Sequence, residues 1–282
     1  MANRGMRRVL LAQGVVSDTR TVSGQQVHFY RHRGSGSGPP MLLVHGLGSS
    51  ANAYWRTIVP LSRTFREIWA LDLPGNGFSP LPSTGALPVR AQVDFVHAFQ
   101  REVIGQPVFL VGNSLGGAMS LYAASERPDA FAALAVISPA GARMSEQRIA
   151  DLKASFDVQT TAQARAMTRR LFHKPPLPVL LFAGELRKLY ASPTVKGVMS
   201  QVQPSDAVTE EMLARLAMPV LLIWGRSEKL LPYESLDYFR AHLPRHAEIH
   251  EVKGFGHMPQ MEHPHELVRR LTRFAEDRGL LR

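Results

Sequence analysis

The sequence predicts an α/β fold, with a mainly parallel sheet, helices on both faces and a helical insertion into the core. Apolar strand-like runs alternate with segments of helical periodicity from Met41 to Gly141, as in the crossover units that join parallel strands. These runs are continuously apolar, which indicates burial on both faces of the sheet. Helical periodicity then dominates residues 142–216, and strand-like runs return after it.

The elements of the first part of the core follow from their residue patterns. Residues 15–31 hold β-rich runs on either side of a Ser-Gly turn, which predicts a hairpin. The apolar residues Val93, Val96, Phe99 and Val103 recur at helical spacing. The other expected elements are, in order, strands in MLLVHG and FREIWALDLPG on either side of a helix in ANAYWRTIVPLSR, a strand in PVFLVGN, a helix in SLGGAMSLYAASERP and a strand in FAALAVISPAG.

The alternation of strand-like and helical segments stops after Gly141. Helices are expected in SEQRIADLKASFD and TAQARAMTRRLFHK, and this region offers no core strand. Strands return in MPVLLIWG and AEIHEVKGFGH, and HPHELVRRLTRFAEDRG is a final helix. We therefore predict that residues 1–141 and 217–282 are two parts of one core and that residues 142–216 are a helical cap.

Composition argues against several classes of protein. No stretch approaches the roughly 18 apolar residues of a membrane span, and there is no cysteine for a disulfide or a thiolate site. The net charge of +10 comes without a run of five like charges or a nucleic-acid motif, so no nucleic-acid partner is expected. The basic start lacks the long apolar core of a secretory signal, so we expect a cytoplasmic protein.

No cofactor and no metal are expected. The sequence holds no Rossmann fingerprint, no Walker loop and no convincing cluster of metal ligands. His263 and His265 do not have the spacing of a zinc-binding helix. A homo-oligomer is compatible with the sequence.

The stretch Val111–Gly117, VGNSLGG, places Ser114 between a strand and a helix, with Gly112 and Gly116 two residues away on either side. Gly-x-Ser-x-Gly in this context is the nucleophile-elbow pattern, in which a strained turn exposes the serine hydroxyl and only small neighbours fit. The helix start also favours developing negative charge. We predict that Ser114 is a nucleophile and not only a helix cap.

A serine needs a general base, and on this fold the partners follow in the order nucleophile, acid, histidine. Of the eleven histidines, His257 in KGFGHMP alone has this order and lies in a loop between the last strand and the last helix. The acid should follow the preceding core strand, where VLLIWGRSEKLLP offers Glu228. An aspartate is more usual, but a glutamate can also fix the imidazole tautomer; Glu234 and Asp237 are the alternatives.

Acyl transfer also requires hydrogen-bond donors for the oxyanion. We expect the backbone N–H of Leu115, directly after the nucleophile, and that of Leu47, in the loop after LLVHG. His45, beside this loop, is expected to be structural.

Taken together, the motifs resemble the α/β-hydrolase fold family. LLVHGLGSS, LDLPGNGFS, LVGNSLGG, ISPAG, LLIWGRSEKLLP and GFGHMP occur in the order found in that family. The resemblance implies a variable cap at the insertion. Within the serine branch, the chain is similar to lipases, esterases and monoacylglycerol-lipase-like enzymes, and next to the hydrolases that cleave carbon–carbon bonds in meta-cleavage products.

Three functions compete. The first is hydrolysis of small-molecule carboxylic esters with an apolar acyl or alcohol part, as the cap residues Phe156, Met167, Leu171, Phe172, Leu177, Val179, Leu181 and Phe182 suggest. The second is carbon–carbon bond hydrolysis. That branch commonly has a tryptophan after the histidine, where this chain has Met258, and a cap arginine, for which Arg169, Arg170 or Arg187 are candidates. The third is a hydrolase-like ligand sensor without catalysis.

Overall fold

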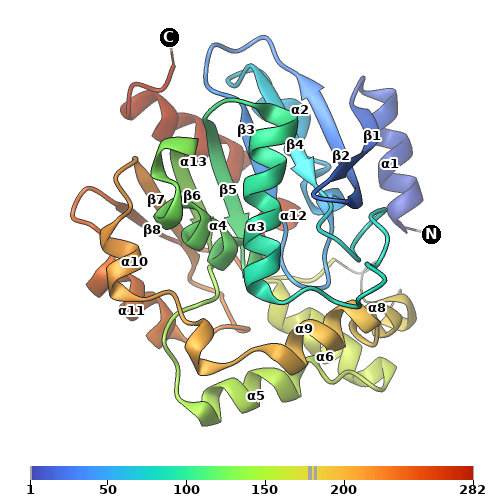
Figure 1. The fold of residues 1–282 in the computed structure, drawn as a ribbon. Helices are drawn as coiled ribbons and strands as arrows, with labels where there is room; N and C mark the ends of the chain where they lie inside the picture. The colour runs from blue at the N-terminus through green and yellow to red at the C-terminus, as the bar shows by residue number, and fades with distance from the viewer. Residues whose placement is uncertain (1, 177–179, 181–182, 282) are drawn as a thin grey trace.

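The computed structural model describes residues 2–176, 180 and 183–281, and an eight-stranded sheet forms its centre (Figure 1). The strands lie in the order β1-β2-β4-β3-β5-β6-β7-β8. β1 and β2 form an antiparallel hairpin, β2 pairs antiparallel with β4, and all pairs from β4 to β8 are parallel. The strands are β1 Val16–Val22, β2 Gln25–Arg33, β3 Met41–Val44, β4 Glu67–Leu71, β5 Val108–Asn113, β6 Phe131–Ile137, β7 Val220–Gly225 and β8 Glu248–Val252.

Helices follow most of the parallel strands, as crossover connections require. Those of the core are α1 Ala2–Ala12, α2 Ile58–Leu61, α3 Val89–Phe99, α4 Leu115–Glu126, α11 Tyr233–His242, α12 Pro259–Glu262 and α13 Pro264–Asp277. Single turns are η1 Ala51–Tyr54 and η3 Pro128–Ala130, and η2 Gln100–Ile104 extends α3 as a π-helix. Between β6 and β7 come α5 Glu146–Phe156, α6 Thr161–Leu171, α8 Ala183–Tyr190, α9 Pro193–Gln201, η4 Pro204–Asp206 and α10 Glu210–Ala214.

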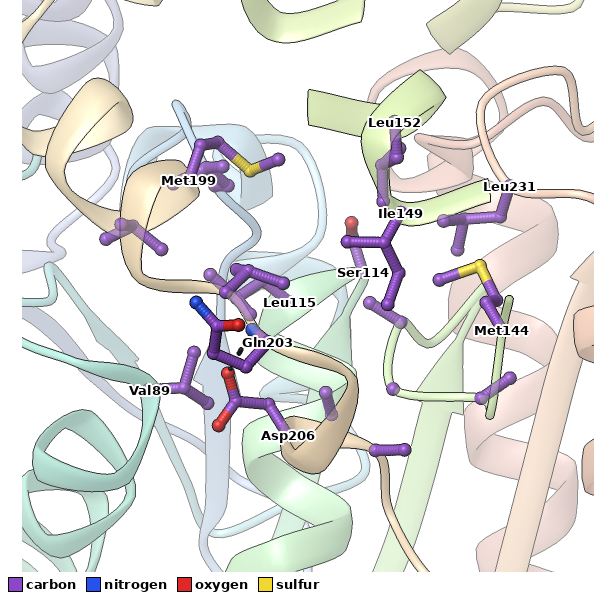
Figure 2. A pocket seen from close by; sticks show the side chains of 18 of the residues that line it. Val89, Ser114, Leu115, Met144, Ile149, Leu152, Met199, Gln203, Asp206 and Leu231 are labelled. Atoms are coloured by element: carbon purple, nitrogen blue, oxygen red, sulfur yellow. Dashed lines mark hydrogen bonds between the residues drawn. The ribbon is translucent and has the colours of Figure 1, made fainter. Parts of the chain in front are cut away.

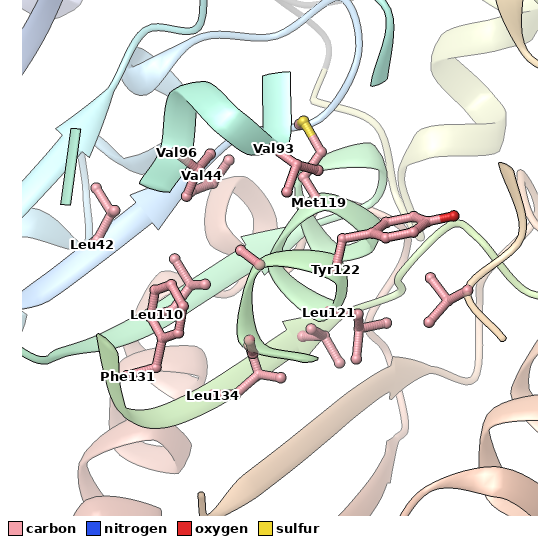
Figure 3. Packing of buried hydrophobic residues seen from close by; sticks show 14 of the residues in the cluster. Leu42, Val44, Val93, Val96, Leu110, Met119, Leu121, Tyr122, Phe131 and Leu134 are labelled. Atoms are coloured by element: carbon pink, nitrogen blue, oxygen red, sulfur yellow. The ribbon is translucent and has the colours of Figure 1, made fainter. Parts of the chain in front are cut away.

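Successive side chains of a strand point to opposite faces of the sheet. The central strands are buried on both faces because helices cover each of them. Leu42, Val44, Leu110 and Leu134 pack with α3 and α4 on one face, as Figure 3 shows. The intervening residues, such as Leu43 and Phe109, pack on the other face. Their partners there are Leu10 of α1, Ile58 and Leu61 of α2, and Leu267, Leu271 and Phe274 of α13. The predicted α/β fold with a two-sided sheet is therefore confirmed.

The helices between β6 and β7 form a third apolar cluster. Phe156, Met167, Tyr190 and Met199 are buried there, with Leu230 of the core packed among them. Figure 1 shows α5, α6, α8 and α9 gathered beyond one end of the strands. Since the carboxyl ends of parallel strands are where loops build binding sites, this segment lies where it can cover one. The exact boundaries of 142 and 216 for a cap domain stay a prediction.

Two elements differ from the sequence analysis. Residues 2–12 form an amphipathic helix that was not expected; its Leu10 is fully buried in the core, and the Arg7 guanidinium lies 4.9 Å from the Phe78 ring centre. The single helix expected in residues 51–63 is instead the two short helices η1 and α2. The N–H of Ala51 donates to a carboxylate oxygen of Asp72 at 2.7 Å, so a tertiary contact starts the first turn. No helix in the described part of the chain is both long enough and apolar enough to cross a bilayer.

Candidate active site

Ser114 stands at the turn from β5 into α4, in a backbone conformation that L-residues rarely adopt, with φ 56° and ψ −120°. The two flanking glycines have close neighbours. A Cβ on Gly112 would lie 2.2 Å from the Gly116 carbonyl oxygen, and a Cβ on Gly116 would lie 2.4 Å from the Val44 carbonyl oxygen. The spacing of the motif thus has a steric cause, because no larger residue fits either position. Strain of this kind clusters at functional sites.

His257 and Glu228 form a buried pair at the ends of the last two strands. The imidazole Nδ1 lies 2.7 Å from Glu228 Oε2, and the two side chains are 3% and 2% exposed. The other carboxylate oxygen, Oε1, accepts the N–H groups of Leu230 at 2.7 Å and Leu231 at 3.1 Å. These bonds hold the carboxylate in place, so the glutamate reaches the imidazole from a fixed position despite its longer side chain.

The environment of Glu228 favours its ionised form. Burial alone would raise the pKa of this carboxyl, but the charge of His257, its hydrogen bond and the two backbone N–H donors together lower the pKa below its usual range. A carboxylate next to Nδ1 fixes the proton there and leaves Nε2 of His257 as the basic atom.

The alternative acids lie elsewhere. Glu234 and Asp237 are exposed on α11, where they pair with Arg148 at 3.0 Å and Arg240 at 2.8 Å.

A second chain of the same residue types occurs at the hairpin. Ser17 Oγ lies 2.7 Å from His28 Nε2, and His28 Nδ1 lies 2.7 Å from Asp72 Oδ2. This Asp72 carboxylate also accepts the N–H groups of Ala51 and Phe78, which ties two loops together. None of the three residues lines either cavity at Ser114. We therefore assign this hydrogen-bonded series of Ser17, His28 and Asp72 a structural role.

The two expected oxyanion donors lie beside Ser114: Leu115 follows it in the chain, and Leu47 shares a cavity wall with both residues. α4 begins at Leu115, whose N–H therefore has no partner within the helix. Among the described residues, the Leu47 N–H donates no hydrogen bond. Leu47 lies in a turn that closes from the Gly46 carbonyl to the Ser49 N–H at 3.2 Å. Both N–H groups are thus available to a ligand beside Ser114.

His45 holds the loop that carries Leu47. Its Nδ1 lies 2.8 Å from the Gly46 carbonyl oxygen, and its Nε2 accepts the N–H of Leu73 at 3.1 Å. Burial lowers the pKa of His45, which keeps the imidazole neutral, as an acceptor at Nε2 requires. The expected structural role of His45 agrees with these contacts.

Asn113 and Gln260 are two buried residues that the sequence analysis missed. The Asn113 Nδ2 group donates to the carbonyls of Ile137 and His257, both at 3.0 Å, and its Oδ1 accepts from Gln260 Nε2 at 2.9 Å. The side chain directly before Ser114 therefore holds the main chain of His257. The signal was present, since a buried amide beside the predicted nucleophile needs partners, but two of its three partners are 144 and 147 residues away.

The helical segment between β6 and β7 contacts both loops of the pair. The N–H of His257 donates to the Leu171 carbonyl at 2.9 Å. The Arg170 guanidinium donates to the carbonyls of Lys229 at 3.0 Å and Leu230 at 3.4 Å, directly after Glu228. This segment therefore helps to position the buried pair.

Two cavities meet at Ser114. A smaller one, of about 30 Å³, is lined by Ser114, His257, Leu47, Asn113 and Tyr190, among others. A larger one, of about 90 Å³, has Ser114 and Leu115 on its wall and extends below α5 and α9 (Figure 2).

The cap residues expected to form an apolar pocket contribute unequally. Phe156 lines both cavities, Met167 and Leu171 line the smaller, and Phe172 is buried but lines neither. Leu177, Val179, Leu181 and Phe182 lie outside the described residues. Within residues 2–176, 180 and 183–281, no group of three or more His, Asp or Glu side chains could hold a metal ion.

A family model described as alpha/beta hydrolase fold matches residues 39–264. The chain belongs to this family. The predicted resemblance is thus confirmed, and the strained serine after β5 lies where this family's nucleophile elbow is expected.

Individual relatives of this α/β hydrolase differ in activity. The chain is 27% identical over 270 residues to the dihydrolipoyllysine-residue acetyltransferase component of an acetoin cleaving system from Pseudomonas putida, a match that covers 93% of this chain and 70% of that protein. It is 28% identical over 253 residues to a pimeloyl-[acyl-carrier protein] methyl ester esterase from Xanthomonas campestris, a match that covers 85% of this chain and 96% of that protein. A crystal structure of a membrane phospholipase A, a bacterial virulence factor, superposes with a TM-score of 0.85 at 25% identity, covering 99% of this chain and 91% of that one.

Proposed function

We propose that this α/β hydrolase is a serine hydrolase of carboxylic esters, with Ser114 as nucleophile, His257 as general base and Glu228 as the acid that orients it. The observation that carries the proposal is the buried His257–Glu228 pair, at 2.7 Å, whose imidazole shares a cavity wall with Ser114. Substrates of the ester class are supported by the esterase among the relatives.

The reaction proceeds by acyl transfer to Ser114 and then to water. Ser114 Oγ attacks the acyl carbon as its proton moves to His257 Nε2, and the N–H groups of Leu47 and Leu115 bind the oxyanion. The intermediate collapses to the acyl-enzyme while His257 gives the proton to the departing alkoxide. Water then attacks the acyl carbon, its proton passes to His257 and on to Ser114 Oγ, and the carboxylic acid leaves.

The cavity walls weigh against carbon–carbon bond cleavage of keto-acid substrates. Such a substrate carries a carboxylate that needs a cationic partner, and the described lining of both cavities contains no lysine or arginine. The three candidate arginines are engaged or exposed elsewhere. Arg170 binds the carbonyls after β7, Arg187 lies 3.5 Å from the Gln159 carbonyl oxygen, and Arg169 is exposed.

The test compares wild type with Ser114→Ala on p-nitrophenyl esters from acetate to dodecanoate. We expect a loss of at least about 10³-fold in kcat, since removal of a serine nucleophile leaves only binding and oxyanion contributions. Ser125→Ala is the matched control: its hydroxyl lies on the same helix and donates to the Tyr122 carbonyl at 2.8 Å, so activity should be unchanged.

Three other outcomes would contradict the proposal. Equal hydrolysis by wild type and Ser114→Ala would show that Ser114 is not the nucleophile. Faster consumption of a dienoic keto-acid than of any ester would favour carbon–carbon hydrolysis. Labelling of Ser114 by a fluorophosphonate without turnover of any ester would favour a ligand sensor.

A further inference from the structure

The exposed part of the larger cavity's wall lies at η4, and we take this end as the mouth of the cavity. Of its described lining residues, only Gln203 and Pro204 are exposed, and both belong to this turn or precede it. Around Ser114 the wall includes the buried side chains of Phe156 and Leu230, and the lining residues that are not buried there are only partly exposed. A substrate chain that starts at Ser114 and follows the cavity therefore has its far end at η4.

Asp206 of η4 is the charged residue at this mouth. Apart from Ser114 and Gln203, the other described lining residues are apolar or glycine, and none is basic. Figure 2 shows Asp206 beside Gln203, on the side of the cavity away from Ile149 and Leu152. The chain as a whole carries a net charge of +10. The single carboxylate among the described lining residues therefore has the opposite sign to the net charge of the protein.

The Asp206 carboxylate accepts a hydrogen bond from the backbone but forms no ion pair with a described residue. Its Oδ2 accepts the backbone N–H of Gln203 at 2.8 Å, and no ion pair in the described part of the chain includes it. The charge of Asp206 acts on Tyr122: burial first, and then this charge, raise the pKa of Tyr122 to about 12, while the charge of Arg90 acts in the opposite direction. A negative charge at the mouth of an apolar cavity is screened less than one in open water.

We propose that Asp206 is a specificity-determining residue that selects ester substrates by the charge at the far end of the chain. Chains that end in an uncharged or cationic group are accepted, and chains that end in a carboxylate are rejected by like-charge repulsion. This inference rests on the proposed ester hydrolysis at Ser114 and adds a substrate class to it: neutral or cation-terminated apolar esters.

The test uses three nitrophenyl octanoates that differ at the chain end: a methyl group, a trimethylammonium group or a carboxylate. A second series places the same three ends on the alcohol chain of acetate esters, so that either part of the substrate can occupy the cavity. The ratio of kcat/KM for the cationic and anionic esters is the readout, because both charged ends lose hydration in an apolar cavity and only the sign differs.

In wild type we expect this ratio to be at least about tenfold in one of the two series. Asp206→Asn keeps an oxygen that can accept the Gln203 N–H but removes the charge, and should reduce the ratio at least about fivefold. The matched control is Asp151→Asn, an exposed acid on α5 that lines neither cavity; it should leave the ratio unchanged. An equal ratio in wild type and Asp206→Asn in both series, or a wild-type preference for the anion, would overturn the proposal.

Binding without turnover separates this test from that of the function. Calorimetric titration with dodecyltrimethylammonium and with dodecanoate should show the same preference for the cation and the same loss of it in Asp206→Asn. If Ser114→Ala hydrolyses the neutral ester as fast as wild type, the catalytic proposal fails, while the titration still decides the role of Asp206. Equal affinities for the two amphiphiles in wild type would refute the charge selection by itself.

Discussion

At the scale of single residues, Glu228 is the acid that we propose to orient His257. A glutamate is one methylene longer than an aspartate, yet its carboxylate is held by two backbone N–H groups while it contacts His257. The sequence could rank Glu228 first by its place after a core strand. It could not exclude Glu234 or Asp237, because their pairing with arginines depends on how α11 packs.

Replacing this carboxylate should affect catalysis more than folding. Glu228→Gln keeps an acceptor for the N–H groups of Leu230 and Leu231 but no longer stabilises a protonated imidazole. We expect kcat to fall by about 10²- to 10⁴-fold, measured on a short nitrophenyl ester. Glu234→Gln, which removes an exposed carboxylate, should retain full activity; a large loss in Glu234→Gln instead would move the acid to α11.

The same pair should contribute to the pH dependence of stability. Because the pKa of Glu228 is lowered in the folded state from its ordinary 4.5, its contribution is fully present above that value and is lost as the pH falls through the lower folded value. Urea unfolding of wild type and Glu228→Gln at pH 7 and pH 4 should show a smaller difference in unfolding free energy at the lower pH. If this difference in unfolding free energy were instead larger at pH 4 than at pH 7, the pKa of Glu228 would be raised in the folded state and not lowered.

At the scale of elements, the turn from β5 to α4 depends on close contact between neighbours. Gly116 lies against the backbone of Val44 and His45 at the end of β3, so α4 can start only where no side chain intervenes. The sequence motif predicted small residues at this position. Which strand imposes the limit follows only from the order β3-β5 in the sheet.

A single methyl group should disrupt this junction. We expect Gly116→Ala to lower the unfolding free energy by more than about 2 kcal/mol, since the methyl would meet carbonyl oxygens that cannot rotate away. Gly5→Ala, inside α1 and with no atom within 4 Å of the added methyl, should stabilise by up to about 1 kcal/mol. Denaturant titration of both variants measures the contrast, and equal stability would refute the steric explanation.

At the scale of the whole molecule, the helical segment between β6 and β7 is bound to the loops that carry His257 and Glu228. The carbonyl of Leu171 accepts the His257 N–H, and Arg170 donates to two carbonyls after Glu228. The segment therefore both covers the cavities and restrains the residues beside them.

Loosening this attachment should reduce activity without unfolding the core. For Arg170→Ala we expect kcat/KM to fall about three- to tenfold, because two charge-assisted hydrogen bonds to the Glu228 loop are lost. The neighbouring Arg169→Ala removes the same charge from an exposed position on the same helix and should have no effect. Ester hydrolysis and thermal unfolding are measured for both; an equal effect of the two variants would mean that the charge matters and the contact does not.

The sequence by itself determined the α/β architecture, the turn at Ser114 and the chain order of its predicted partners, because strand periodicity, glycine spacing and loop position are local properties of the chain. It did not reveal the helix at residues 2–12, whose Leu10 is buried by tertiary contacts, nor the bond from Asn113 to Gln260. The tertiary structure alone decided which residues line the cavities and which of these residues are exposed. Those features depend on contacts between segments more than a hundred residues apart, and side-chain packing, unlike secondary structure, leaves no periodic pattern in the sequence.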